Sequence, residues 1–437
     1  MKKLLLFFGR PATLLALLLA GPIQTIYAQA PELAAPTAVF AGVPQETLQP
    51  GSAMSFALFD EAFYNNQLFL LGEAHGVQKP QEVDFELFRH LNQRAGVRYY
   101  VGEFDCAKAY YLNQYLRTGD DSTLLRVFRS WVRDESQWAN QDLFGKFRKL
   151  RALNLTLPPK RQIQFVGLDE LQDLPLTADY LRWLLNKKDY PDLLRQQGDS
   201  LQTLLRQSPP TAALSALARR TLAELKQHPK SYQFTLGASY EPLRHLLTNL
   251  TYRADGLGRE QIIFTNFRTL SQTKELMGQK LYGLWGLAHV LQRPLQGGPT
   301  MFAGLVRQSA LPMHDKVVSI MCAFSGCRML FPNSSLPAAW QTKGQTYGST
   351  DKFNHDGPLT VIAGFDELKA RTQPGSTTLF RLDAAGAATG RQPIRVTYAP
   401  GIPVAQQLQF NPQVPAAAYV QYLVLVRDSG MVQPLRP

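Results

Sequence analysis

The sequence is poor in cysteine. Only Cys106, Cys322 and Cys327 occur, so at most one internal disulfide can form, and Cys322 and Cys327 would pair only if a turn brings them together. No Cys-x-x-Cys spacing exists, which argues against a thiolate metal site. Cys106 lies beside acidic residues and has no histidine next to it, so we expect a buried small side chain there rather than a nucleophile.

Several catalytic signatures are missing as well. The chain has no Gly-x-Ser-x-Gly elbow, which argues against an α/β-hydrolase. It also has no His-Glu-x-x-His and no glycine-rich phosphate loop. The triplet Asp428-Ser-Gly430 matches the aspartic-protease motif once, as chance allows. Any catalytic group therefore has to be sought among dispersed residues.

No apolar run is long enough to span a bilayer. The N-terminus has a basic head, Met1-Lys2-Lys3, followed by a short apolar core that Arg10 and Pro11 interrupt. This pattern predicts a secretory signal peptide over residues 1–30, and no transmembrane segment after its removal. We therefore expect an exported protein, either periplasmic or secreted.

The chain that remains after signal cleavage is basic. Loss of Lys2, Lys3 and Arg10 lowers the formal net charge from +12 by three, to +9. The basic residues are scattered, so we expect a small-molecule substrate as partner and no nucleic acid. Residues 31–50 are rich in proline and alanine and predict a spacer, and 51–437 are then long enough for one large α/β domain.

The most informative stretch begins with four large apolar residues, Leu68–Leu71. Such a run predicts a strand that is buried on both faces, as in a parallel sheet with helices on either side. Gly72, Glu73 and His75 follow at the carboxyl end of this strand. Ligands bind at that end of the strands in open α/β sheets.

Three later apolar runs also end in ionisable residues. Because the carboxyl ends of parallel strands share one edge of a sheet, these groups are expected to converge on a single pocket. The runs and the residues that follow them are Val97–Val101 with Glu103 and Asp105, Arg161–Gly167 with Asp169 and Glu170, and Lys280–Leu287 with His289.

Helical periods alternate with these runs, which predicts an α/β fold with a central, mostly parallel sheet flanked by helices. Residues 174–251 are leucine-rich and lack strands, so we expect a helical insertion that caps the edge of the sheet. Further strands are expected at Lys316–Met321, Pro358–Ile362 and Tyr419–Val426, further helices at Gln81–Asn92, Ala107–Leu116, Leu124–Val132, Gln141–Leu153 and Phe267–Met277, and long loops over 331–358 and 383–415.

Two imidazoles and several carboxylates at one edge suit two kinds of chemistry. One is activation of water by a histidine that a carboxylate orients, which needs no cofactor. The other is binding of a divalent metal such as zinc, with His75, His289, Glu73 and Glu103 as the ligands. The sequence leaves both open.

Some of these residues also fit structural roles. His289 has apolar neighbours and would suit a hydrogen-bonded core position. Asp105 and Asp169 would each suit the N-cap of a following helix. The remaining histidines lie in polar or loop settings, where we expect solvent exposure: His90, His228, His245, His314 and His355.

Seven short segments together carry a family resemblance. They are Leu71-Gly-Glu-Ala-His-Gly76, Val101-Gly-Glu-Phe-Asp105, Ala109-Tyr-Tyr-Leu-Asn-Gln-Tyr115, Trp138-Ala-Asn140, Phe165-Val-Gly-Leu-Asp169, Asn266-Phe-Arg268 and Gly286-Leu-Ala-His289. Their order and spacing, over roughly residues 68–330, resemble the erythromycin esterase-like family. That family lies in a larger EreA/ChaN-like grouping, which also holds ChaN-type haem-binding proteins and the Tiki metalloproteases.

The resemblance implies a hydrolase that cleaves an ester or lactone bond with histidine-activated water and without an acyl-enzyme. His75 and His289 would form the catalytic pair, with Glu73 and Glu103 as supporting acids. Arg268 would hold a carboxylate or an oxyanion. We assign substrate binding to two further acids at the strand ends, Asp105 and Asp169.

The spacing of the first motif leaves alternatives open. Only Ala74 separates Glu73 from His75, whereas the esterases usually have two intervening residues and the ChaN-type proteins have one. The alternatives are therefore a haem- or porphyrin-binding protein, a metal-dependent hydrolase or protease of the Tiki type, and a family member without catalysis.

Overall fold

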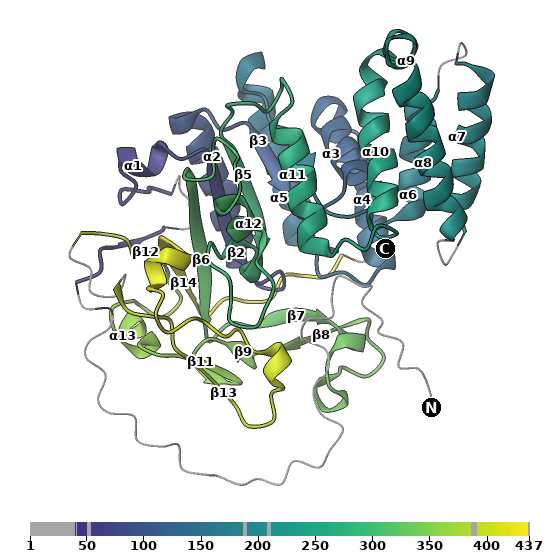
Figure 1. Cartoon of the computed structure of the whole chain (residues 1–437). Helices are drawn as coiled ribbons and strands as arrows, with labels where there is room; N and C mark the ends of the chain where they lie inside the picture. The colour runs from purple at the N-terminus through teal and green to yellow at the C-terminus, as the bar shows by residue number, and fades with distance from the viewer. Residues whose placement is uncertain are drawn as a thin grey trace.

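The computed structural model describes residues 40, 42–49, 54–186, 190–207, 211–385 and 391–435. The predicted signal peptide lies outside these ranges. At the centre is an eight-stranded sheet in the order β1-β12-β14-β6-β2-β5-β3-β4 (Figure 1). Its strands are β1 Gln45–Thr47, β2 Leu68–Glu73, β3 Tyr99–Gly102, β4 Gln164–Gly167, β5 Leu281–Gly286, β6 Val317–Ser325, β12 Thr377–Arg381 and β14 Tyr422–Arg427.

The sheet is mostly parallel, as the sequence predicts. All pairs from β14 across to β4 are parallel, whereas β12 runs antiparallel to both of its neighbours, β1 and β14. Every residue of β2 is buried, which explains why its sequence is an unbroken apolar run rather than an alternating one. The α/β class is confirmed.

Helices cover both faces of the sheet. Alternate side chains of β2 enter two different cores: Phe69 and Leu71 pack with helices α2 to α5, and Leu68 and Leu70 pack with α11 and α12. The helices outside the insertion are α1 Glu61–Tyr64, α2 Lys79–Ala95, α3 Cys106–Thr118, α4 Asp121–Arg133, α5 Gln141–Thr156, α11 Arg259–Ser271, α12 Phe302–Arg307, α13 Phe365–Ala370 and α14 Ala416–Tyr419.

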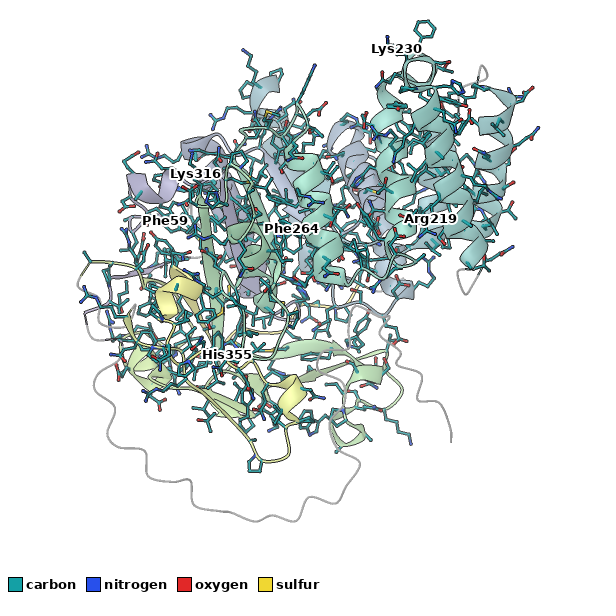
Figure 2. All side chains as sticks on the ribbon, in the orientation of Figure 1. Phe59, Arg219, Lys230, Phe264, Lys316 and His355 are labelled. Atoms are coloured by element: carbon teal, nitrogen blue, oxygen red, sulfur yellow. The ribbon has the colours of Figure 1, made fainter. Side chains whose placement is uncertain are left out.

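Five helices occupy the region of the expected insertion, and they do not lie over the carboxyl edge of the sheet. Figure 1 shows them to one side of the sheet, where the first of them packs on α3. Figure 2 shows Arg219 of this insertion well to one side of Phe264, which lies on α11 over the sheet. The five helices are α6 Leu174–Leu184, α7 Asp192–Leu205, α8 Ala212–Gln227, α9 Pro229–Leu236 and α10 Tyr240–Tyr252.

The carboxyl edge of the sheet is covered instead by segments that follow β6. Lys316 precedes β6 and His355 is hydrogen-bonded to Phe324 near its end, and Figure 2 shows the two labels at opposite ends of the strand. The small strands here pair in three two-stranded sheets: β7 Met329–Pro332 with β8 Tyr347–Thr350, β9 Phe353–Asn354 with β10 Gly357–Pro358, and β11 Thr360–Ile362 with β13 Val396–Tyr398.

A C-terminal segment ties two loops at this edge together. The N–H of Val432 donates to the carbonyl of Gly76, and the N–H of Leu435 donates to the carbonyl of Ala139. The N–H of Leu330 in β7 donates to the same Gly76 carbonyl. The turn after β2 is thereby fixed from two sides.

Several boundaries differ from those expected. The predicted helix Phe267–Met277 is displaced, because α11 begins at Arg259 with a polar first turn and residues 272–278 form turns. Residues 45–47, within the predicted spacer, pair with β12 as an edge strand. The predicted strand Pro358–Ile362 is split between β10 and β11, outside the main sheet.

Two remaining expectations concern cysteine and histidine. Cys322 and Cys327 do not pair: both are free and buried, as β6 carries Cys322 in the core while Cys327 follows the turn after it. His228 and His314 are exposed as expected, whereas His90, His245 and His355 are half-buried. None of the helices described is long and apolar enough to cross a membrane.

Candidate active site

The ends of β2, β3 and β5 bring one cluster of ionisable side chains together. β2 pairs directly with β5, and Glu73 stands opposite Gly286 in the register. Gly72 makes room for the segment that follows β5, because a Cβ at Gly72 would lie 2.6 Å from a methyl group of Val290. The short helix η3, Leu287–Val290, can therefore pack against β2 and present His289 beside His75.

Glu73 and His75 form a direct pair. Oε1 of Glu73 lies 2.6 Å from Nδ1 of His75, while the second oxygen, Oε2, is buried and has no hydrogen-bond partner. Burial raises the pKa of Glu73, although His75 and Lys146 oppose this. Only 20% of the His75 side chain is exposed, and its Nδ1 is engaged by Glu73. The pair leaves Nε2 of His75 for other partners.

Glu103 occupies the centre of the cluster. Its Oε2 accepts the N–H of Gly286 at 2.8 Å and lies 3.6 Å from Nε2 of His75. Its Oε1 lies 3.4 Å from Nε2 of His289. Burial alone would raise the pKa of Glu103, but His289, Arg259 and His75 hold it well below the ordinary value. Glu103 is therefore a carboxylate shared by two imidazoles.

His289 is flanked by a second carboxylate that the sequence did not suggest. Oε1 of Glu260 lies 2.8 Å from Nδ1 of His289, in a contact that lacks the angle of a hydrogen bond. The other Glu260 oxygen accepts the N–H of Phe302 at 2.8 Å. Burial lowers the pKa of His289, but Glu260 and Glu103 outweigh this and raise it to about 10.

His75 behaves in the same way. Burial alone would lower the pKa of the His75 imidazole, yet the Glu73 and Glu103 carboxylates outweigh burial and raise the pKa to about 10. The neighbouring carboxylates thus favour the doubly protonated, cationic form of both imidazoles. The cluster thus holds a set of alternating positive and negative charges.

Arg259 is the arginine of this site. It donates to both oxygens of Asp169, at 3.0 and 2.6 Å, and to Oε1 of Glu103 at 2.7 Å. Its Nη1 lies 3.4 Å from Nε2 of His289. Asp169 therefore acts as the anchor of Arg259 rather than as a helix cap. Arg259 was missed because the first turn of α11 is polar and gives no apolar period.

Three of the residues singled out in the sequence lie elsewhere. Arg268 is exposed on α11, with its guanidinium 5.9 Å from the ring of Phe264, and it does not reach the cluster. Asp105 caps α3 and is paired with buried Lys108 at 2.9 Å, so its oxygens are engaged. Glu170 is paired with Arg253. These placements give Arg268 and Asp105 no route to a substrate at the cluster.

Gly286 leaves a small niche between the side chains of the cluster. A Cβ on Gly286 would lie 3.4 Å from Nε2 of His75, 3.4 Å from Cδ2 of His289 and 3.6 Å from Oε2 of Glu103. The backbone of Gly286 has φ −59° and ψ 146°, which any residue adopts. A methyl group at this position would therefore meet these three side chains at ordinary contact distances and fill the space between them.

The donor set does not favour a metal centre. Within the described ranges, no three or more histidine, cysteine, aspartate or glutamate side chains are arranged to hold one metal ion. The nitrogen and oxygen atoms here face one another, as in the pairs of Glu73 with His75 and Glu260 with His289.

A separate cavity of about 630 Å³ lies away from this cluster, between α3, α4 and α6. Tyr110 and Trp183 line it, with ring centres 4.3 Å apart. Arg126 and Asp179, which face each other at 3.7 Å, contribute to its polar wall. The side chains that line this cavity belong to none of the strand ends described above.

The fold and the cluster define an α/β protein whose parallel sheet carries paired histidines and carboxylates at its carboxyl edge. No protein-family model matches the sequence, and no curated protein matches it either. Comparison of folds is informative, because several solved structures share this architecture.

Three solved structures match most of the chain. A Bacillus cereus protein is 15% identical with a TM-score of 0.60, over 86% of this chain and 92% of its own. A mutant of the erythromycin esterase EreC in its open conformation is 14% identical with a TM-score of 0.60, over 90% and 100%. A succinoglycan biosynthesis protein is 14% identical with a TM-score of 0.58, over 86% and 91%. The predicted erythromycin esterase-like fold is confirmed.

Proposed function

We propose that the protein is a hydrolase that cleaves an ester or lactone bond with water activated by His75. The observation that carries this proposal is the niche at Gly286, which is bordered by Nε2 of His75, Oε2 of Glu103 and the ring of His289. A water molecule placed there would lie beside one base and one carboxylate. The fold shared with an erythromycin esterase supports the same class of reaction.

His75 is the general base in this mechanism. Oε1 of Glu73 accepts a hydrogen bond from Nδ1–H of His75, which keeps the proton on Nδ1 and the lone pair on Nε2, as in other carboxylate–histidine pairs. Nε2 removes a proton from water while the water oxygen bonds to the carbonyl carbon. The electron pair of the C=O bond moves to its oxygen and gives a tetrahedral intermediate.

His289 and Arg259 supply positive charge for that intermediate. Their nitrogen atoms lie 3.4 Å apart at the inner end of the cluster, and both contact Oε1 of Glu103. When the intermediate collapses, the bond to the alcohol oxygen breaks and that oxygen takes the proton from Nε2 of His75. The products are a carboxylic acid and an alcohol, and His75 is again neutral.

The pKa of His75 gives the mechanism a distinct pH dependence. Because the neutral imidazole is the base and its pKa is raised to about 10, only a small fraction is active at pH 7. kcat/KM of the free enzyme should therefore rise about tenfold per pH unit well below that pKa and pass through a maximum near pH 10, because His289, whose pKa is also about 10, has to stay protonated. A stopped assay at constant ionic strength from pH 6 to 10.5 measures this. A profile that is flat above pH 7 would contradict His75 as the base.

Replacement of the histidines tests the function directly. His75→Ala and His289→Ala should each abolish hydrolysis of a panel of esters and lactones, while His314→Ala, at an exposed position, should leave it unchanged. Full activity in both variants would remove the proposal. The same panel with a chelator, and a haem titration followed at the Soret band, distinguish a metal-dependent hydrolase and a haem-binding protein.

We also propose that the protein is exported, on the strength of the basic head and short apolar core within residues 1–30. Cell fractionation with an antibody to the folded domain tests this. Retention of the full-length chain in the cytoplasm would contradict it.

A further inference from the structure

The ring of Trp138 lies directly beside the ring of His75. Their centres are 4.6 Å apart, with an angle of 39° between the planes. Trp138 also contacts Trp131 of α4 at 6.0 Å, nearly parallel, and Trp131 meets Phe128 edge-on at 5.1 Å. Trp131 and Phe128 are fully within the core, whereas Trp138 is half-buried. A line of aromatic rings thus connects the core to the imidazole.

The loop that carries Trp138 is held in place along its length. It begins at Glu135, whose φ of 49° is unusual for a residue other than glycine. The N–H of Ser136 donates to the carbonyl of Trp131 at 2.9 Å. From the segment after β6, the hydroxyl of Ser334 donates to Glu135 at 2.9 Å and that of Tyr347 donates to the Ser136 carbonyl at 3.1 Å.

The end of the loop is fixed as well. Oδ1 of Asn140 accepts the N–H of Leu143 at 2.7 Å and caps α5, and the side chain of Gln137 donates to the carbonyl of Leu330. Backbone held in a rare conformation by this many contacts is typical of functional loops. The contacts determine where the indole lies, and the indole lies against His75.

We propose that Trp138 is a positioning residue, whose indole holds the imidazole of His75 with Nε2 toward the niche at Gly286 and stabilises its protonated form. The proposal rests on the proposed function, in which His75 is the base. Trp138 acts through His75 and is not assigned any contact with the substrate.

The contacts of His75 show why a second support is needed. The hydrogen bond from Nδ1 to Glu73 and the 3.6 Å approach of Nε2 to Glu103 both act at the edge of the ring. The indole packs against the ring itself and limits its rotation about the Cβ–Cγ bond. The charged groups that face His75 are Glu73 at the end of β2 and Glu103 after β3, and Arg259 of α11 reaches the latter. An indole face adds a cation–π contribution to theirs.

Two variants distinguish the aromatic face of Trp138 from the volume of its side chain. Trp138→Leu keeps an apolar side chain over His75, so water does not replace the indole, but it removes the π face. Trp138→Phe keeps an aromatic face. Trp183→Leu is the matched control, because it deletes an exposed indole of α6 that lines the separate cavity. If Trp138→Leu does not fold, Trp138→Met takes its place.

The experiment measures kcat across pH with an ester substrate, and the ring signals of His75 by NMR in ¹⁵N-histidine protein. For Trp138→Leu we expect kcat at the maximum of its pH profile to fall about tenfold or more, because the base is misplaced. The midpoint of the pH profile and of the His75 signals should move to lower pH. Trp138→Phe should restore most of both, and Trp183→Leu should change neither.

The outcomes separate this proposal from the function on which it rests. Unchanged His75 signals and an unchanged pH midpoint in folded Trp138→Leu would overturn the positioning role, even if the wild type is a hydrolase. If the wild type hydrolyses nothing in the panel, the NMR midpoint still decides whether Trp138 stabilises the imidazolium. A loss of kcat without any change in midpoint or ring signals would assign Trp138 a merely structural role and would also overturn it.

Discussion

Two clusters of buried charge lie close to the same sheet, and they differ in how completely their polar atoms are hydrogen-bonded. In the core, Asp84 of α2 accepts Tyr100 and Tyr282 hydroxyls at 2.9 and 2.6 Å and pairs with Lys146 at 2.5 Å. Lys146 also donates to Gln81 at 2.8 Å. Each of these charged groups has its partners and none faces an opening.

The cluster at the carboxyl edge is left incomplete. Oε2 of Glu73 has no hydrogen-bond partner, Nδ1 of His289 meets Glu260 at a poor angle, and a niche remains against Gly286. Buried polar atoms are normally satisfied, so unsatisfied ones call for an explanation. Both clusters are buried and charged, so the completeness of their hydrogen bonds is what separates the structural cluster from the candidate active site.

Glu103 should show the largest effect on activity. Glu103→Gln keeps the shape of the side chain but removes the charge that both imidazoles share. We expect kcat/KM for ester hydrolysis to fall about a thousandfold, within the range typical of acid–base groups. Circular dichroism spectra of the wild type and of Glu103→Gln check that the fold is kept. A loss below tenfold would mean that the edge cluster is as structural as the core cluster.

Replacement of Lys146 should lower stability and leave activity in place. Lys146→Met leaves Asp84 buried without its cation, which costs about 3–5 kcal/mol of unfolding free energy. Urea unfolding measures this. The folded fraction should still hydrolyse esters with a measurable kcat, since Lys146 pairs with Asp84 and Gln81 and acts on the site only through the effect of its charge on the pKa of Glu73. A stable variant would show that the two tyrosine hydroxyls suffice for Asp84.

Gly286 tests the niche itself. In Gly286→Ala the new methyl group would occupy the space beside Nε2 of His75, and we expect about a hundredfold loss of kcat/KM with little change in stability. Gly145→Ala in α5 is the control, because a Cβ there meets nothing within 4 Å. Retained activity in Gly286→Ala would place the attacking water elsewhere.

Arg268 should show the smallest effect. Arg268→Ala removes an exposed side chain that stacks on Phe264, so kcat/KM is expected to change by no more than about twofold. Arg259→Ala under the same assay should lose far more, because its guanidinium joins Glu103 to Asp169. Equal effects of the two would show that charge near α11, rather than position, is what matters.

The sequence predicts the sheet well because β2, β5 and β6 are buried on both faces and therefore read as apolar runs. Glu73, His75, Glu103 and His289 follow directly from that pattern, since they lie at the ends of those strands or of β3. Each apolar run with an ionisable residue behind it is a local pattern. The residues come together because the carboxyl ends of parallel strands share one edge of the sheet.

The remaining members of the site come from packing that leaves no local pattern. Arg259 and Glu260 open a helix whose first turn is polar, so they look like solvent-exposed residues until α11 is placed on the sheet. Trp138 belongs to one of the seven segments of the family resemblance, but its place beside His75 depends on contacts of its loop with Ser334 and Tyr347, about 200 positions later. The expected cap was wrong for a similar reason, because an insertion's sequence does not say against which side it packs.

The hydrogen bonds from Val432 and Leu435 have a consequence for biogenesis. The turn after His75 and the loop of Trp138 are synthesised early, but their carbonyls at Gly76 and Ala139 are met by a segment translated much later. Under the proposed function, the active site of a nascent chain would be complete only after that segment has emerged from the ribosome. Synthesis and hydrolysis would then be separated in time.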